Sequence, residues 1–187
     1  MHPTQLPPHL KYYIYINMFP LTFLPNSSIM RLVFFERSYP LLDLTNISVE
    51  NIKECLALEL EQWQKNDVRP FANCLSYAYV EPEAIIPLAI VLDNKPIGFI
   101  VIKLDFENKT ISLTDFMIDY RSQMKGFGTQ ALRELILFAD SLNDFKRIEV
   151  FVTMGNGAAY HALEKVGFMR GTVDLGKRKN QLVYILE

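Results

Sequence analysis

The stretch at residues 115–132, DFMIDYRSQMKGFGTQAL, constrains the fold more than any other part of the chain. An apolar run typical of a strand ends near Ile118, and a short polar crossing follows it. Two glycines, Gly126 and Gly128, then stand just before a helical pattern. The pattern is amphipathic, because apolar residues recur at three- and four-residue spacing: Leu132, Leu135, Ile136, Ala139 and Leu142. The glycines therefore lie where a strand leads into a helix.

A helix that begins beside glycines offers unpaired hydrogen-bond donors. Its first N–H groups have no partner within the helix, and the helix dipole adds partial positive charge there. Glycine lets the backbone turn tightly and lets a bulky anion approach without a Cβ in the way. Gln123, Lys125 and the Thr129 hydroxyl can add donors to the same place. The two glycines alone are equally compatible with a simple tight turn.

Two known phosphate-binding loops do not fit these letters. GFGTQA, from Gly126 to Ala131, matches the letters of the dinucleotide fingerprint. That fingerprint normally follows its strand directly, whereas here the polar crossing separates it from the strand that ends near Ile118. That fingerprint also needs an acidic residue at the end of the next strand, where this chain has Val152 and Thr153. The ATP-type loop is excluded because no Gly-Lys-Ser/Thr follows the glycines.

Three sets of residues resemble a known family. The pattern Q-x-x-G-x-G running into a helix after FMID resembles the acetyl-CoA-binding motif of the GNAT N-acetyltransferase superfamily. Gly155-Asn156 and LEKVGF (163–168) resemble that family's second motif. NIKECLALEL (51–60) and FANCLSYAYVEPEAIIPLAIV (71–91) resemble its diamine and spermidine acetyltransferase branch. The resemblance runs from about residue 40 to the end of the chain.

The resemblance implies an α/β fold of a particular kind. We expect a mixed, mostly antiparallel twisted sheet of about six or seven strands with about four flanking helices. Its central parallel strand pair would splay to admit CoA. Main-chain groups of Phe116, Met117 and Ile118 would bind the pantetheine. The pyrophosphate would lie on the following loop, and the implied CoA-binding residues there and beyond are Gln123, Met124, Lys125, Gly126, Phe127, Gly128, Thr129 and Asn156.

The implied reaction is direct attack of an amine on acetyl-CoA in a ternary complex, with positioning supplying much of the rate. An ammonium must first lose a proton, so a general base is needed. Asp115 is the best candidate, although a solvent-facing charge is an equal interpretation. Glu81 and Glu83 can bind a cationic acceptor, or can belong to a solvated loop.

The chain departs from the family at the general acid. The family's Tyr, four residues before the glycine of the Gly-Phe pair, is replaced by Leu163, which cannot donate a proton. Tyr160 lies one helical turn earlier and either substitutes as the acid or packs against its neighbours. We favour packing, and the departure puts catalytic competence in question.

The remaining pattern predicts the other elements in order. A first strand near 41–44 precedes a helix that Ser48 caps and whose apolar face runs from Ile52 through Cys55, Leu56 and Leu60 to Trp63. A helix at 71–79 follows, and then an antiparallel meander of strands at 88–92, 97–104 and 110–118. A strand at 147–152 should pair in parallel with the strand at 110–118. The last predicted elements are a helix that Asn156 caps and a hairpin of 168–174 with 182–186. Strict alternation in 110–118 would place Leu113, Asp115 and Met117 on one face and Phe116 and Ile118 on the other.

Composition and charge exclude some function classes. A chain of 187 residues, half of them hydrophobic, suits one globular domain, and a formal charge of −2 argues against nucleic acid as a partner. Cys55 and Cys74 suggest buried thiols in a reducing compartment, and the histidines His2, His9 and His161 lack metal-ligand spacing. We therefore expect a cytoplasmic protein without a metal or a membrane partner, and leave a homodimer open.

Residues 1–38 do not resemble the family. The apolar, aromatic run at 9–24 is interrupted by Lys11, Asn17 and Pro20, and it is too short for a membrane span. We expect an N-terminal extension of unknown role, or a segment upstream of an alternative start at Met30, followed by a GNAT acetyltransferase domain at 39–187.

The predicted function is acetyl transfer from acetyl-CoA to a primary amine of a small molecule, with a polyamine or diamine as the first choice. The alternative acceptors are a protein N-terminus and an aminoglycoside. A protein that binds acetyl-CoA as a sensor with little turnover is the alternative from another class, and Leu163 is the feature that favours it.

Overall fold

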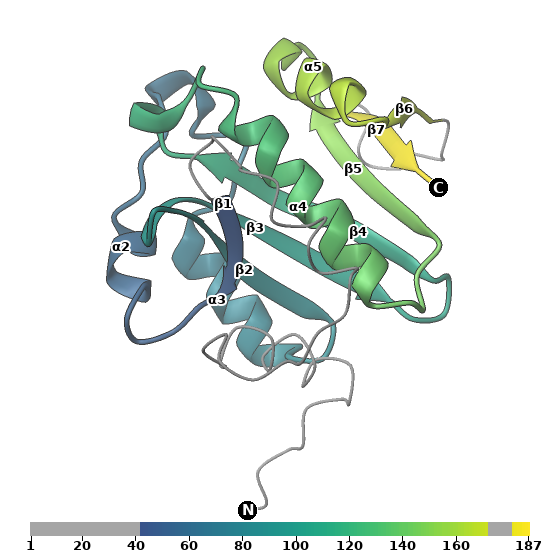
Figure 1. Cartoon of the computed structure of the whole chain (residues 1–187), viewed down its shortest axis with the longest axis horizontal. Helices are drawn as coiled ribbons and strands as arrows, with labels where there is room; N and C mark the ends of the chain where they lie inside the picture. The colour runs from purple at the N-terminus through teal and green to yellow at the C-terminus, as the bar shows by residue number, and fades with distance from the viewer. Residues whose placement is uncertain (1–41, 172–180) are drawn as a thin grey trace, which may run out of the picture. The chain divides into compact units, whose positions relative to one another are not determined.

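The computed structural model describes residues 42–171 and 181–187. They form a seven-stranded sheet in the order β1-β2-β3-β4-β5-β7-β6 (Figure 1). The strands are β1 (Leu42–Asn46), β2 (Ile85–Leu92), β3 (Lys95–Asp105), β4 (Thr110–Ile118), β5 (Arg147–Thr153), β6 (Met169–Arg170) and β7 (Gln181–Leu186). Only β4 and β5 pair in parallel among these strands. The predicted fold class is thus confirmed, while the expected extension at 1–38 and residues 172–180, which include part of the expected terminal hairpin, lie outside the described residues.

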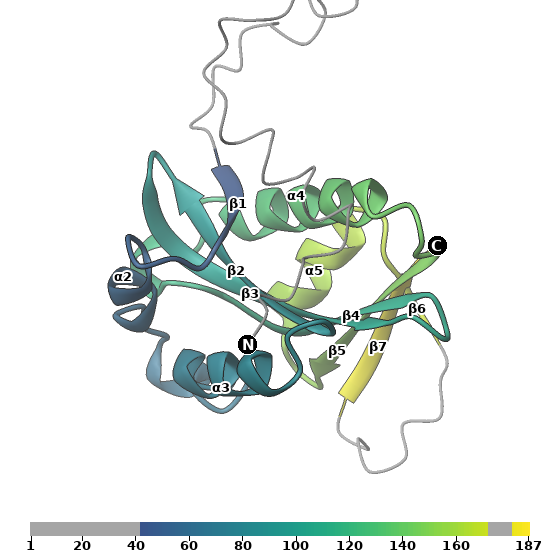
Figure 2. The same cartoon turned by 90° about the horizontal axis from the view of Figure 1, so that it is seen from below.

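Within the described residues, four helices cover the two faces of this sheet. Figure 2 shows α2 and α3 on one face and α4 and α5 on the other. Their bounds are α2 (Ile52–Leu56), α3 (Phe71–Val80), α4 (Phe127–Ser141) and α5 (Gly157–Lys165), with 3-10 turns η2 (Gln62–Gln64) and η3 (Tyr120–Ser122). The periodicity that predicted α4 is confirmed, since Leu132, Leu135 and Ala139 are buried.

The meander of β2, β3 and β4 follows the predicted pattern. The β2–β3 turn consists of Asp93 and Asn94, both left-handed with φ of 48° and 64°, as a type I′ hairpin turn requires. Beneath α2 and α3, a core cluster includes Phe71, Cys74 and Phe99. Burial raises the pKa of the Cys74 thiol to about 12, so this cysteine acts as a small core side chain.

A bulge in β4 corrects the predicted alternation. Leu113 pairs with Ile102 and Asp115 pairs with Val101, so Thr114 is an extra residue without a partner. One extra residue reverses the facing of everything beyond it. Leu113 and Asp115, predicted to share a face, therefore face opposite sides.

The first helix is much shorter than predicted. It ends at Leu56, and Trp63, expected on its apolar face, is 69% exposed. The cause is a tertiary contact, because the backbone N–H of Glu59 donates to Asp119 Oδ2 (3.0 Å) and Glu59 O accepts from the Tyr120 N–H (3.0 Å). These bonds hold the chain after α2 against the end of β4, where a continuing helix could not reach.

Asp119 is the hub of that contact and is buried. Besides the Glu59 N–H, its carboxylate accepts from the backbone N–H of Arg121 (3.0 Å), Arg121 Nε (2.7 Å) and Arg121 Nη2 (2.7 Å). Burial alone would raise the pKa of Asp119, but these hydrogen bonds outweigh it and leave the pKa below its ordinary value of 3.8.

We predict that Asp119→Asn lowers the free energy of unfolding by about 2 kcal/mol at neutral pH, because it removes hydrogen bonds to a buried charge. A carboxyl with a lowered native pKa stabilises the fold above its unfolded pKa and loses that contribution as the pH falls through the native value. The difference from the wild type should therefore shrink below about pH 4. Chemical denaturation at pH 7 and pH 3 measures it, with Asp93→Asn in the exposed β2–β3 turn as the control. An equal difference at both pH values would contradict the assignment.

Candidate active site

The parallel pair of β4 and β5 separates partway along its length. Its register ends at Leu113 with Val150, whereas β4 stays paired with β3 to Ile118 and β5 stays paired with β7 to Thr153. The facing edges beyond that point carry backbone groups without a partner strand. Such an edge accepts an extended chain that bears amide groups.

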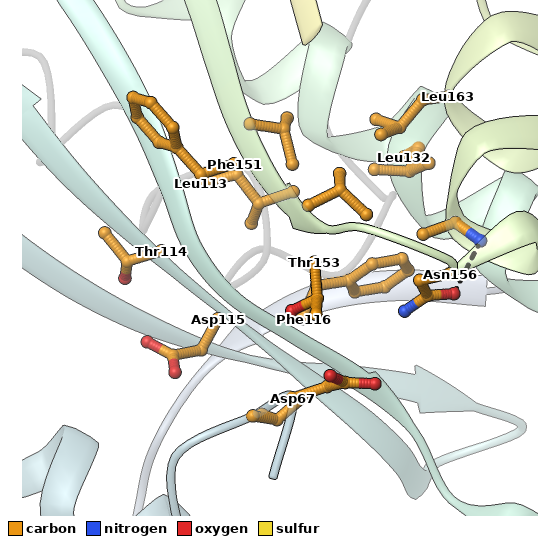
Figure 3. A pocket seen from close by; sticks show the side chains of 14 residues that line it. Asp67, Leu113, Thr114, Asp115, Phe116, Leu132, Phe151, Thr153, Asn156 and Leu163 are labelled. Atoms are coloured by element: carbon orange, nitrogen blue, oxygen red, sulfur yellow. Dashed lines mark hydrogen bonds between the residues drawn. The ribbon is translucent and has the colours of Figure 1, made fainter. Parts of the chain in front are cut away.

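A cavity fills this separation (Figure 3). We call it the opening. Its lining comes from both strands, from α4 and α5, and from the loop before α3: Asp67, Val68, Leu113, Thr114, Asp115, Phe116, Leu132, Val150, Phe151, Val152, Thr153, Asn156, Ala159 and Leu163. Of the predicted pantetheine-binding residues, Phe116 lies in the lining, and Met117 and Ile118 continue the same strand edge toward α4.

The glycine junction lies at the start of α4. Gly126 is the N-cap with a left-handed φ of 84°, and the first helical bond runs from the Gln130 N–H to Gly126 O (3.1 Å). Within the described residues, the backbone N–H groups of 124–129 have no hydrogen-bond partner. A Cβ built on Gly126 would meet nothing within 4 Å, so the space above these donors is open. These features fit a diphosphate.

Gln123 has a different use from the one expected. Its Nε2 donates to Ile118 O (2.8 Å) and to Gln64 Oε1 (2.9 Å), which uses both N–H groups of the amide. The side chain therefore fixes the junction in this structure, with both of its N–H groups bonded within the protein. Lys125 Nζ donates to Arg121 O (2.8 Å) from an exposed position. Among the described residues, the Thr129 hydroxyl has no hydrogen-bond partner.

Asp115 is neither free nor facing solvent. Its side chain is 3% exposed, and its two oxygens accept from Arg69 Nε (3.0 and 3.1 Å), from Arg69 Nη2 and from the Arg69 backbone N–H (3.2 Å). The solvent-facing interpretation is wrong. The carboxylate instead anchors the loop at 65–70, which precedes α3.

Tyr160 is engaged by the backbone of the β5–α5 turn. Its hydroxyl donates to Thr153 O (3.0 Å) and accepts from the Gly155 N–H (2.9 Å), and its ring stacks on Tyr184 with centroids 5.7 Å apart. Leu163, at the family's acid position, is buried and lines the opening. Asn156 Oδ1 accepts from the Ala159 N–H (3.1 Å), so the predicted cap of α5 is confirmed.

A wider cleft of about 760 Å³ adjoins the opening and shares part of its lining. Loop 65–70, Tyr77 of α3 and residues of β3 and β4 surround it. Of the two predicted acceptor residues, Glu81 lines the cleft but pairs with Lys103 (Oε2–Nζ, 2.8 Å). Glu83 lines neither cavity.

Sequence reasoning missed Asp67 and Arg69. Both lie on loop 65–70, outside every predicted helix and strand, and both line the cleft. Arg69 meets Asp115, which is 46 positions away in the sequence, so no local spacing links them. A charged cluster directly before Pro70 was the available signal, because functional side chains concentrate on loops held by a rigid scaffold.

A family model described as the acetyltransferase (GNAT) family matches residues 49–168. The chain therefore belongs to the GNAT family of acetyltransferases. This confirms the prediction of an acetyl-CoA-dependent acetyltransferase at the level of the family. A comparison with curated protein sequences found no match.

Solved structures show the same fold. A candidate ribosomal-protein-serine acetyltransferase from Vibrio cholerae aligns with a TM-score of 0.60 and 20% identity, over 78% of this chain and 92% of that one. A chimera of the Vibrio cholerae spermidine N-acetyltransferase SpeG with hSSAT aligns with a TM-score of 0.62 and 15% identity, over 77% of this chain and 93% of the chimera. Mycobacterium smegmatis RimJ, solved with CoA-disulfide, aligns with a TM-score of 0.54 and 19% identity, over 63% of this chain and 60% of RimJ. These neighbours do not single out the diamine branch.

Residues 42–171 and 181–187 lack two features. No helix there has the length and apolar character needed to cross a bilayer. No group of three or more His, Cys, Asp or Glu side chains there is arranged to hold a metal ion.

We predict that Gly126→Val weakens CoA binding by at least about tenfold, because a side chain at this left-handed position strains the backbone and enters the space above the free donors. Isothermal titration calorimetry with CoA measures the loss. Gly167→Val is the matched control, since Gly167 also has a left-handed φ, of 102°, but ends α5 away from the loop. Normal CoA binding by Gly126→Val would show that the loop is misassigned.

We predict that Tyr160→Phe lowers the free energy of unfolding by about 1–2 kcal/mol, because Thr153 O and the Gly155 N–H each lose a partner. Turnover should change less than about threefold, a difference of under 1 kcal/mol in the barrier. Thermal unfolding and a thiol-release assay measure the two effects. A large fall in turnover with unchanged stability would make Tyr160 the general acid.

Proposed function

We propose that this chain transfers the acetyl group of acetyl-CoA to the primary amine of a small molecule that enters the cleft beside loop 65–70. The observation that carries the proposal is that the two cavities share part of their lining. The opening would hold an extended pantetheine chain along the unpaired edge of β4, and Asp67, Leu113, Thr114 and Asp115 line both the opening and the cleft. An amine in the cleft would thus reach a thioester in the opening.

The protein's own groups would do three things in this reaction. Backbone N–H groups at the start of α4 would hold the diphosphate, and the free edge of β4 would align the pantetheine. The apolar side chains of Leu132 and Leu163 would exclude water from the thioester end. Holding both reactants side by side then supplies the rate enhancement.

The charges of the cleft bear on the choice of acceptor. In the cleft, Arg69 forms an ion pair with Asp115, and Lys103 forms one with Glu81. The other two charged residues of the lining, Lys65 and Asp67, have no charged partner among the described residues. One free carboxylate can bind one ammonium group. A diamine or polyamine remains the first acceptor to test, but its further ammonium groups would have to lie at the exposed rim beside Glu81.

A sensor that binds acetyl-CoA with little turnover is the second candidate. Two observations favour it. Leu163 puts a hydrocarbon side chain at the position of the family's acid, and the Tyr160 hydroxyl is already bonded to two backbone groups. Since a thiolate is a good leaving group, loss of the acid is expected to slow transfer and not to abolish it.

We predict thiol release from acetyl-CoA in the presence of at least one amine in a panel of putrescine, spermidine, a peptide with a free N-terminus and an aminoglycoside. A thiol-reactive dye measures release, and reactions without amine correct for hydrolysis. Thermal stabilisation by acetyl-CoA without release on any amine would favour the sensor. The absence of both effects would contradict both functions.

A further inference from the structure

We infer that Asp67 is the general base of this chain, taking the proton from the acceptor ammonium before attack; this inference rests on the proposed transfer to an amine. Asp67 lies on the loop between η2 and α3, and its backbone N–H donates to Gln64 O (2.9 Å). The loop is fixed at its other end by the bonds between Arg69 and Asp115.

The location of Asp67 is the first argument. It lines both the opening and the cleft, so it stands where an amine from the cleft would meet a thioester in the opening. In Figure 3 its carboxylate points toward the side of Phe116 and Asn156, whereas the Asp115 carboxylate points the other way. A base must come within hydrogen-bond reach of the proton it removes, and an ammonium held where the two cavities share their lining would lie beside Asp67.

Availability is the second argument. Three carboxylates line the cleft, and two of them are already paired. Asp115 accepts from Arg69 with both oxygens, and Glu81 accepts from Lys103. Asp67 is exposed and has no bonding partner for its side chain among the described residues. The charged groups that surround it in the cleft are Lys65, Arg69, Glu81, Lys103 and Asp115.

The proton balance of the step is complete without another group. Asp67 takes one proton from the ammonium, and the neutral nitrogen forms a bond to the thioester carbonyl carbon as the carbon–sulfur bond breaks. The nitrogen loses a second proton on becoming an amide, and this proton neutralises the departing thiolate. Asp67 then returns its proton to solvent through the exposed cleft. This route needs no acid at the position of Leu163.

Asp115 has a different role under this assignment. By holding the backbone N–H and the guanidinium of Arg69, it fixes the loop two residues from Asp67. It is therefore a positioning residue.

The experiment compares wild-type protein with Asp67→Asn, Asp67→Glu and the control Asp93→Asn, using the panel amine that the wild type acetylates fastest. We expect Asp67→Asn to lower kcat/KM for the amine by about 100-fold, as for loss of a general base. The loss should shrink as the pH rises toward the pKa of the amine, because a neutral amine needs no base. Asp67→Glu should restore part of the rate, and Asp93→Asn should match the wild type. Calorimetry should show unchanged acetyl-CoA affinity in all four proteins.

The outcomes separate this inference from the proposed function. If the wild type acetylates an amine and Asp67→Asn does so within about twofold and with the same pH dependence, the base assignment is wrong and the proposed function stands. If Asp67→Asn also loses acetyl-CoA affinity, Asp67 acts on the fold of the site and is not the base. If the wild type releases no thiol with any amine of the panel, the proposed function fails and the base assignment fails with it.

Discussion

The candidate site depends on hydrogen bonds that β4 and β5 do not make with each other. In a parallel sheet the pairing normally continues along both strands, and here it stops after Leu113 and Val150. Each strand keeps its other neighbour, so the separation costs pairing on one edge only. The bulge at Thr114 lies directly beyond the last pair, and bulges bend the strand that carries them. The backbone of β4 thereby becomes a binding surface without losing its place in the sheet.

Two buried carboxylates of the β4 region hold the segment between α2 and α3. Asp115 bonds to Arg69, and Asp119 bonds to the backbone N–H of Glu59. The segment between α2 and α3 is thus attached at both of its ends to the strand whose edge would carry the cosubstrate. The reciprocal amide pair of Gln64 with Gln123 adds a third attachment between them. In the proposed reaction, one strand would therefore position both the acceptor wall and the cosubstrate edge.

The elements that the sequence predicted well are those with local causes. The helix after Gly126, the cap at Asn156 and the turn at Asp93-Asn94 all depend on residues close together in the chain. The helix predicted through Trp63 failed because bonds to Asp119 and Tyr120, distant in sequence, override its apolar periodicity. The alternation in β4 failed because no residue type marks a bulge at Thr114. Asp67 and the Arg69–Asp115 pair could not be predicted because their contacts are distant in sequence. Only the folded sheet brings loop 65–70 beside β4.

The three-point attachment of the segment after α2 has a consequence for how such a protein can diversify. Lys65 and Asn66 face the cleft between attachment points and make none of the bonds described there. Their side chains can be exchanged while the strand that would carry the cosubstrate keeps its geometry. A chain built this way can acquire a new acceptor by point substitution in one short loop, and needs no insertion or rearrangement of the sheet.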